Sequence, residues 1–339
     1  MEENGKQTED YTDSITFTYD KDKHALRKLW DEAFDDPEEF ADYYFENVCV
    51  ENRVLSAYVE EKLVGMVHLN PYTVMVDGQA YESYYVVGVA VDYEYRQRGI
   101  MKAMLNAVKT DLKNEGVPFI FLMPALEEYY NNLGFKKIYN TKSMDFTIVE
   151  AEDFEREVSD CYASLMLSTY HMSELGKEEL SVMSEVVNQR LSETYKIYCK
   201  RDEKYLESMV SEHLCQCGDV CFVTEYMMSE GEEELEDLNV IGVFGYGIDD
   251  DTMYVERFES FDSNAMALMI SVLKLAIETS CTRCIITVPS GQVDAYEDIM
   301  EGIELSVSDD KGIMLCVLGE NEEELVNLFN NNTFIDEIV

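Results

Sequence analysis

A short basic turn between an apolar strand and a helix is the segment of this sequence best suited to chemistry. Arg96, Arg98 and Lys102 place three cations close together in a chain that has few of them. Gly99 lies among them, and a glycine lets the backbone approach a ligand closely because it has no Cβ. The unpaired N–H groups and the dipole at a helix start attract anions. We therefore expect an anion site that suits a diphosphate, although arginine-rich helix starts also occur as ordinary surface turns.

The segments on either side position this turn. Residues 81–91 (YESYYVVGVAV) alternate at first and then become almost continuously apolar, which predicts a strand buried on both faces. After the turn, apolar residues recur with the period of a helix, and residues 116–118 (GVP) end it. The apolar helix positions are Met101, Met104, Leu105, Val108 and Leu112.

The motif of the turn and the charge of the chain together exclude several classes of ligand. The turn is neither a GxxxxGK(S/T) phosphate loop nor a GxGxxG dinucleotide fingerprint. The chain has 26 Lys and Arg against 70 Asp and Glu, a formal net charge of −44. Such a field repels nucleic-acid backbones and anionic lipid headgroups, so we expect neither as a partner. It would attract a cationic amine, although solubility is the plainer explanation for the excess of acid.

Two marks together resemble the GCN5-related N-acetyltransferase (GNAT) superfamily. The turn resembles the acetyl-coenzyme A motif Arg/Gln-x-x-Gly-x-Gly/Ala, with Arg96, Gly99 and Met101 in its defined positions and Met101 replacing the usual small residue. Residues 126–135 (LEEYYNNLGF) resemble the family's tyrosine followed by Gly-Phe, because Tyr130 stands four residues before Gly134. The resemblance covers roughly residues 15–150.

The resemblance implies direct transfer of an acetyl group from acetyl-CoA to a primary amine, as a small-molecule substrate. The pantetheine arm would pair with backbone groups of Val89 and Val91, as an added strand would. Main-chain amides from Gln97 to Lys102 would hold the diphosphate. The cofactor-binding residues that this implies are Val89, Val91, Arg96, Gln97, Arg98, Gly99, Ile100, Met101 and Lys102.

The resemblance also implies catalytic roles. Tyr130 would protonate the departing thiolate, with its neighbour Tyr129 as the alternative. An ordinary tyrosine has a pKa near 10 and a thiol one near 8.5, so this proton transfer is slightly uphill. Related tandem enzymes use the terminal carboxylate as the base, which points to Val339, or to Glu337 or Asp336 beside it. A frayed tail and a water chain from a glutamate are the alternatives.

The length of 339 residues predicts two domains. We expect an α+β chain of tandem GNAT-type folds, each a mixed, mostly antiparallel sheet flanked by helices. Residues 1–150 would form the acetyl-CoA-binding domain, and 151–339 a degenerate copy with a tail. This arrangement resembles the enhanced intracellular survival (Eis) acetyltransferases without their sterol-carrier-like third domain. Residues 258–263 match the basic turn but are acidic and lack glycine, so one cofactor site per chain is expected.

Local patterns in the second half predict helices at 154–170, 178–198 and 202–214. The sequence has no run of 18 apolar residues, so no membrane-spanning helix is expected. Nine cysteines and an acidic amino terminus favour reduced thiols in the cytoplasm. His213, Cys215, Cys217 and Cys221 lie close together, but their spacing is not that of a structural zinc site, so no metal is expected.

Two further readings of the function stay open at this point. Another acyl donor or a hydroxyl acceptor would keep the chain an enzyme, whereas a lapsed site would make it a non-catalytic acyl-CoA-binding or sensing protein. The resemblance also suggests a homo-oligomer. It places two early helices, around Trp30 and Tyr43, over the acceptor side, where carboxylates and aromatic rings would suit a cationic amine.

Overall fold

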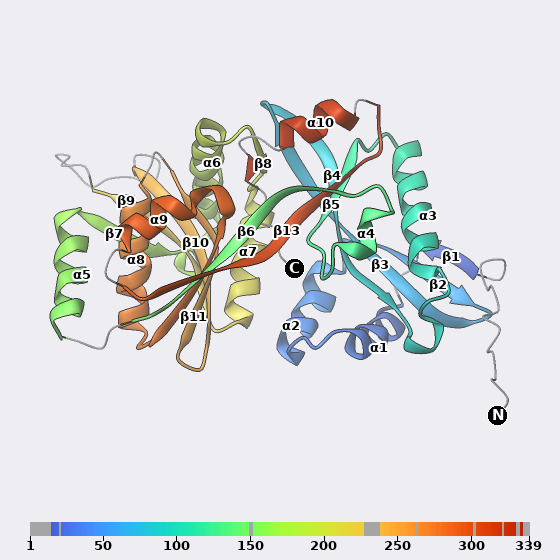
Figure 1. Ribbon diagram of the computed structural model, residues 1–339, viewed down its shortest axis with the longest axis horizontal. Helices are drawn as coiled ribbons and strands as arrows, with labels where there is room; N and C mark the ends of the chain where they lie inside the picture. Colours follow the sequence, from blue (N-terminus) through green and yellow to red (C-terminus); the bar gives the residue numbers. More distant parts are fainter. Residues whose placement is uncertain are drawn as a thin grey trace.

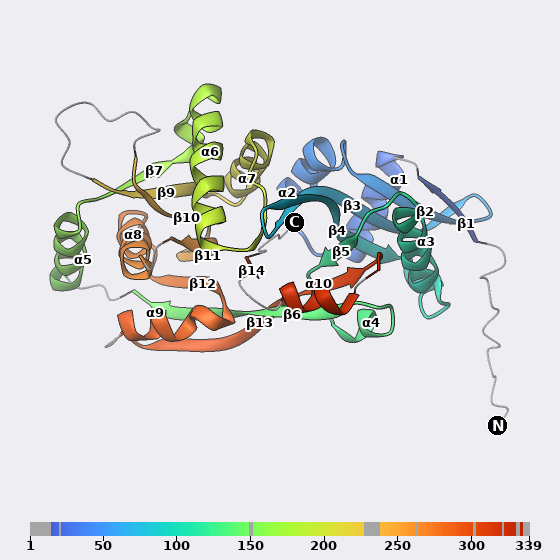
Figure 2. The same cartoon turned by 90° about the horizontal axis from the view of Figure 1, so that it is seen from above.

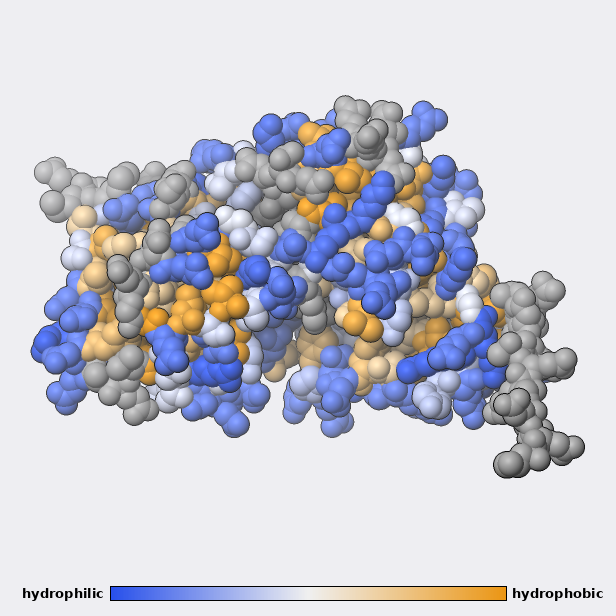
Figure 3. All heavy atoms as spheres, viewed as in Figure 1, coloured by the Kyte–Doolittle hydropathy of each residue, from blue (hydrophilic) through white to orange (hydrophobic). Residues whose placement is uncertain are grey.

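The computed structural model describes residues 15–19, 22–148, 152–226, 238–261, 264–300, 303–320, 322–329 and 333–334. The described strands form one 14-stranded mixed sheet with helices on both faces, which confirms the α+β class (Figures 1 and 2). The order along its main path is β1-β2-β3-β4-β5-β13-β6-β12-β11-β10-β9-β7. Hydrophilic residues cover much of the face in Figure 3, as the 70 acidic side chains lead one to expect.

The first half builds a sheet of antiparallel strands around one parallel pair, β4 and β5. Its strands are β1 (Ile15–Tyr19), β2 (Arg53–Val59), β3 (Lys62–Val76), β4 (Gln79–Val91), β5 (Phe119–Leu122) and β6 (Lys136–Thr147). Its helices are α1 (Lys23–Ala33), α2 (Glu38–Tyr43), the π-helix η2 (Tyr44–Val48), the 3-10 turn η3 (Tyr93–Tyr95), α3 (Ile100–Asn114) and α4 (Glu128–Asn131).

Strand β3 runs straight through a proline. The sequence pattern predicts two runs there, at residues 63–72 and 73–76, but the structure has a single strand. The pairing of β3 with β2 stops at Leu69, opposite Arg53, and its pairing with β8 (Ile197–Cys199) starts at Val74, opposite Cys199, so among the described strands Pro71 has a neighbour on one side only. A proline without an N–H group is tolerated at such an edge.

The second half repeats the order hairpin, helix, strand, short helix, strand. Its strands are β7 (Leu167–His171), β8 (Ile197–Cys199), β9 (Asp219–Glu225), β10 (Val240–Asp249), β11 (Thr252–Ser260), β12 (Arg283–Pro289), β13 (Leu305–Val317) and β14 (Thr333–Phe334). Its helices are α5 (Glu152–Ser164), η4 (Met172–Glu174), α6 (Lys177–Thr194), α7 (Glu203–Cys215), α8 (Ala265–Glu278), η6 (Ser290–Gln292), α9 (Val293–Ile299) and α10 (Glu322–Phe329).

Two of the predicted helices are too long. The helix predicted to reach residue 170 ends at Ser164, and β7 follows it. The helix predicted to reach residue 198 ends at Thr194, and β8 follows it. Both short strands are fixed by distant partners, β7 by β9 and β8 by β3, so tertiary pairing overrides the local helical pattern.

The two halves of the chain share strands. Strand β13, from the end of the chain, lies between β5 and β6, while β6 also pairs with β12. Figure 1 shows β6 and β13 running side by side from one half of the molecule to the other. The boundary at residue 150 stays a prediction, and any domain drawn there would be completed by a strand from the other half.

Helices α1 and α3 cover opposite faces of the first-half sheet. Met66 packs with the α1 cluster and its neighbour Val67 with the α3 cluster. Successive side chains of a strand point to opposite faces, so the two helices lie on either side of β3. The basic turn joins the end of β4, a strand of this sheet, to the start of α3, which covers one face of the sheet.

Candidate active site

Strand β4 separates from its parallel neighbour near its middle. The two strands pair only at Tyr84 with Ile120 and at Tyr85 with Phe121. Strand β4 continues to Val91, whereas β5 ends at Leu122. Among the described strands, none pairs with β4 on this side beyond Tyr85, so its backbone groups line a splayed edge.

A bulge lies just past the separation. The register between β3 and β4 shifts between Met66, opposite Ala90, and His68, opposite Val87. Gly88 has φ of +57° there, and a Cβ on it would lie 2.6 Å from the Trp30 ring. Only glycine combines that backbone conformation with that close approach.

The backbone of Val91 faces the splayed edge. The N–H of Asp92 donates to the Val64 carbonyl at 2.9 Å, which makes Asp92 and Val64 a hydrogen-bonded pair across β3 and β4. Such pairs alternate along an antiparallel ladder, so Val91, opposite Gly65, directs its N–H and C=O away from β3. The Val91 carbonyl accepts a hydrogen bond from Nε of Arg96 at 3.0 Å.

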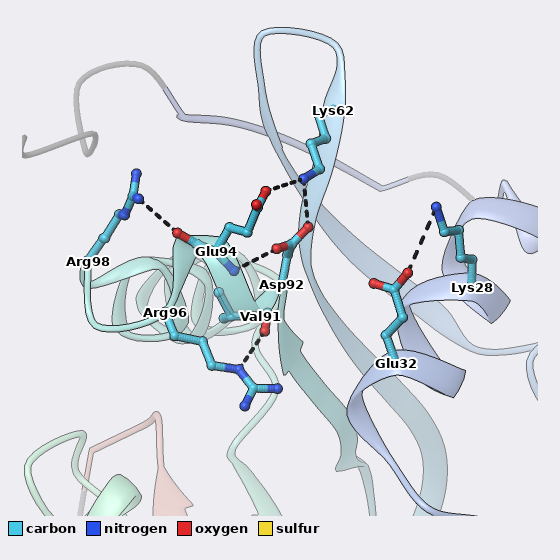
Figure 4. A network of polar contacts seen from close by, with 8 residues as sticks. All are labelled: Lys28, Glu32, Lys62, Val91, Asp92, Glu94, Arg96 and Arg98. Atoms are coloured by element: carbon cyan, nitrogen blue, oxygen red, sulfur yellow. Dashed lines mark hydrogen bonds and ion pairs between the residues drawn. The ribbon is translucent and has the colours of Figure 1, made fainter.

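Charged side chains hold the turn in shape (Figure 4). The Lys62 ammonium lies 2.9 Å from Asp92 and 3.4 Å from Glu94. The Asp92 carboxylate accepts the Glu94 N–H at 2.9 Å, and Arg98 donates to the Glu94 carbonyl at 2.8 Å. Partial burial opposes ionisation of Asp92, but the hydrogen bonds from Lys62 and the Glu94 amide prevail and lower its pKa.

The start of α3 follows at once. Gly99 is the N-cap in the left-handed region, with φ of 79°, and Gln97 is also left-handed at 62°. The first bond within the helix runs from Ala103 to the Gly99 carbonyl. The amides of residues 100–102 therefore have no acceptor within the helix and point out of its start. The structure thus gathers the predicted cofactor residues from Arg96 to Lys102 at one helix end, beside Val89 and Val91 on β4.

A cavity of about 290 Å³ lies between α1 and this turn. Its apolar residues come from α1, the end of β4 and the turn, and charged residues surround them. It includes both Val91 and Arg96, so it adjoins the splayed edge. The lining residues are Lys28, Leu29, Glu32, Ala33, Lys62, Val91, Asp92, Tyr93, Glu94 and Arg96.

Tyr130 lies on the α3 side of the sheet. It is 9% exposed and packs against Phe135 with ring centroids 5.6 Å apart. It belongs to the same apolar cluster as Ile100 of α3, and Val89 packs against this cluster. Burial raises the pKa of Tyr130 to about 12. Its neighbour Tyr129 is 57% exposed and lies outside this cluster.

The second half supplies part of the wall behind Tyr130. The cluster that contains Tyr130 includes three residues from β13 or just after it, namely Met314, Cys316 and Leu318. A Cβ on Gly134 would lie 3.6 Å from Sγ of Cys316. The sequence did not predict this contribution of β13, since the only residues of the second half expected at the site were those of the tail.

A buried polar cluster on the α1 side was also missed. Nδ1 of His68 lies 3.1 Å from the Tyr44 hydroxyl, which also accepts from Asn52 at 2.9 Å and lies 3.3 Å from Asn70. Within the described part of the chain, Nδ2 of Asn70 is buried without a hydrogen bond. The signal was present, since His68 and Asn70 interrupt an apolar strand at alternate positions. Above them Trp30 donates to Asp36 at 2.9 Å.

The second half carries a comparable bulge, and buried ion pairs lie beside it. The register of β10 and β11 shifts there, and Arg257 has φ of 50°. Its guanidinium donates to Glu212 at 2.9 Å and to the Tyr205 hydroxyl at 2.8 Å, while Arg201 pairs with Glu259 at 2.5 Å. These buried ion pairs favour a single cofactor site per chain, which stays a prediction because part of the matching turn lies outside the described residues.

Three predicted residues of the tail, Val339, Glu337 and Asp336, lie outside the described residues. In the described ranges no three His, Cys, Asp or Glu side chains are grouped to hold a metal ion. No helix within those ranges is long and apolar enough to cross a membrane.

Comparison with known proteins identifies the class. Residues 14–138 match the family of the acetyltransferase (GNAT) domain. The chain therefore carries a GNAT domain and is an acyltransferase, which confirms the resemblance drawn from the basic turn and the Tyr130 segment. Among curated proteins, none matches this sequence.

Solved structures agree with this fold over most of the chain. A probable N-acyltransferase from Enterococcus faecalis is similar, with a TM-score of 0.65, 14% identity, and coverage of 90% of this chain and 72% of that one. A GCN5-related N-acetyltransferase from Anabaena variabilis reaches 0.62 at 12% identity, covering 90% and 73%. Saccharomyces cerevisiae N-myristoyltransferase with bound myristoyl-CoA reaches 0.55 at 10% identity, covering 89% and 82%. At these identities the likeness shows the fold.

Proposed function

We propose that the protein transfers the acetyl group of acetyl-CoA to a primary amine, by direct attack in a ternary complex. The observation that carries the proposal is the splayed edge of β4, which leads directly into the exposed amides at the start of α3. A donor with a peptide-like arm and a diphosphate fits this geometry, because the strand edge offers backbone partners and the helix start attracts anions.

The donor would lie along β4. Its pantetheine arm would pair with Val89 and Val91, and its diphosphate would rest on the amides of residues 97–102. Arg96, Arg98 and Lys102 would add positive charge there. The first half of the chain, residues 1–150, would bind the donor, and residues 151–339 would form the degenerate copy.

Tyr130 would assist departure of the coenzyme A thiolate. With its pKa near 12, full proton transfer to a thiolate of ordinary pKa 8.5 is uphill by about 3.5 units, or about 5 kcal/mol. A hydrogen bond that strengthens as negative charge develops on sulfur needs no complete transfer. The raised pKa has the further effect that Tyr130 keeps its proton through the neutral and alkaline range.

The acceptor would approach from the α1 side of the Gly88 bulge. The chain's net charge of −44 favours a small cationic amine. Val339, Glu337 and Asp336 are the proposed sources of the general base. We propose the cytoplasm as the compartment, since nine cysteines suit a reducing environment.

The test is release of free thiol from acetyl-CoA in the presence of polyamines and aminoglycosides. Amine-dependent release supports the proposal. Binding of acetyl-CoA without release on any amine would instead make the protein an acyl-CoA-binding or sensing protein, and release only with a longer acyl-CoA would change the donor.

A further inference from the structure

We propose that Arg96 selects donors that carry a diphosphate, by closing the splayed edge of β4 until a diphosphate draws its guanidinium away. This inference rests on the proposed function, because it concerns how the acyl donor enters the same site. It assigns to Arg96 a second role beyond adding positive charge at the turn.

The first step of the argument is that Arg96 occupies a group the donor needs. The Val91 carbonyl points away from β3 and towards the splayed edge, where the pantetheine arm would pair. Nε of Arg96 already donates to that carbonyl at 3.0 Å (Figure 4). The side chain thus stands where a pantetheine N–H would donate, and both cannot take the same direction at this oxygen.

The second step is that Arg96 can leave without loss of the turn. The shape of the turn depends on other bonds, those of Lys62 with Asp92 and Glu94 and that of Arg98 with the Glu94 carbonyl. Arg96 is exposed, and its guanidinium lies 5.6 Å from the ring of Tyr93, which is 83% exposed. Its movement would therefore uncover little apolar surface.

The third step is that a diphosphate is a better partner than the carbonyl. The bond to the Val91 carbonyl joins a cation to a neutral acceptor, whereas a bond to a phosphate oxygen joins opposite charges and can be bidentate. The helix start that would hold the diphosphate begins three residues after Arg96, at Gly99. A diphosphate there would attract the guanidinium and release the Val91 carbonyl for the pantetheine arm.

The consequence is discrimination between donors. A thioester of pantetheine without phosphate has to compete with Arg96 for the Val91 carbonyl. Acetyl-CoA brings the group that removes this competitor. The site would then exclude short thioesters by competition rather than by shape.

The test compares acetyl-CoA with acetyl-pantetheine as ligands of the full chain and of Arg96→Met, which keeps an unbranched stem. Binding is measured by calorimetry and, for weak ligands, by ligand-observed NMR. We expect Arg96→Met to bind acetyl-CoA about tenfold more weakly and acetyl-pantetheine about threefold more tightly, from the strengths of the bonds lost and released.

Lys102→Met is the matched control. It removes the same charge from the start of the same helix, at a side chain that neither donates to Val91 nor belongs to the bonds described above as holding the turn in shape. It should weaken acetyl-CoA and leave acetyl-pantetheine unchanged. Unchanged, weaker or undetectable binding of acetyl-pantetheine to Arg96→Met overturns the inference. The proposed function still stands in that case, provided that wild type binds acetyl-CoA. Failure of wild type to bind acetyl-CoA overturns both.

Discussion

Leu315 of β13 lies directly opposite Phe121 of β5, so a strand from the end of the chain completes the sheet beside the candidate site. On its other side, β13 pairs with β6. The first half of the chain is thus joined to the second by backbone hydrogen bonds as well as by sequence. This arrangement has a direct consequence for truncated proteins.

Residues 1–150 alone should not fold into a stable domain. Removal of β13 exposes the edge of β5 and takes Met314, Cys316 and Leu318 out of the cluster around Tyr130. Loss of these three buried side chains, at about 2–5 kcal/mol each, is comparable with the whole stability of a typical domain, and the pairing of β5 with β13 is lost as well. Thermal unfolding followed by circular dichroism checks this. A cooperative transition and retained acetyl-CoA binding in the fragment would show that β13 is dispensable.

Gly88→Ala should destabilise the protein more than an ordinary glycine substitution does. The added Cβ would lie 2.6 Å from the Trp30 ring at a backbone of positive φ. Gly78→Ala is the matched control, because Gly78 also has positive φ, at 80°, but has no atom within 4 Å of the added Cβ. Urea unfolding should place Gly88→Ala about 1–3 kcal/mol below the control, from the clash alone. Equal losses in the two variants would mean that the Trp30 contact yields freely.

Tyr130→Phe should lower kcat about 10- to 100-fold and leave the KM for acetyl-CoA nearly unchanged, since it removes a group that acts only as the thiolate leaves. With a pKa near 12, Tyr130 stays protonated to about pH 11, so it should give wild type no alkaline loss of activity below that pH. Tyr129→Phe is the control, and its kinetics should match wild type because Tyr129 lies outside the cluster. A large effect of Tyr129→Phe with none from Tyr130→Phe would reverse the assignment.

His213 should make the protein acid-sensitive. Burial, with the nearby positive charge of Arg257, lowers its pKa to about 3 from an ordinary value of 6.5. The unfolded chain therefore binds a proton that the folded chain does not between pH 6.5 and 3. Stability from this group is complete above pH 6.5 and falls as the pH drops through that window, by at most about 1.4 kcal/mol per pH unit.

The measurement is urea unfolding of wild type and His213→Gln at several pH values. The variant loses this ionisation, so the difference between the two proteins should shrink as the pH falls from 6.5 towards 3. A difference that is constant across the window would show that His213 is protonated alike in both states.

The sequence was informative where function depends on contiguous residues. The strand that ends at Val91 and the helix that starts after Gly99 are encoded locally, and both are found as predicted, while the left-handed conformation of Gly99 is a finding of the structure. Tyr130 was placed by its distance from Gly134, within one short segment. These features need no knowledge of the distant chain.

The rest depends on residues far apart in sequence. The position of β13 beside β5 is set by pairing across most of the chain, and short strands such as β7 and β8 look helical until their partners are known. The bond from Arg96 to Val91 was also unexpected, because it follows from the direction of one carbonyl, which depends on the register with β3.

Calorimetric titration of acetyl-CoA into the full chain, with and without Arg96→Glu and Arg98→Glu combined, tests the proposed donor site most directly. We predict one molecule bound per chain in wild type and no measurable binding after charge reversal, since two cations facing a diphosphate become two anions. Absence of heat with wild type, or equal affinity in the two proteins, would contradict a donor that rests on this turn.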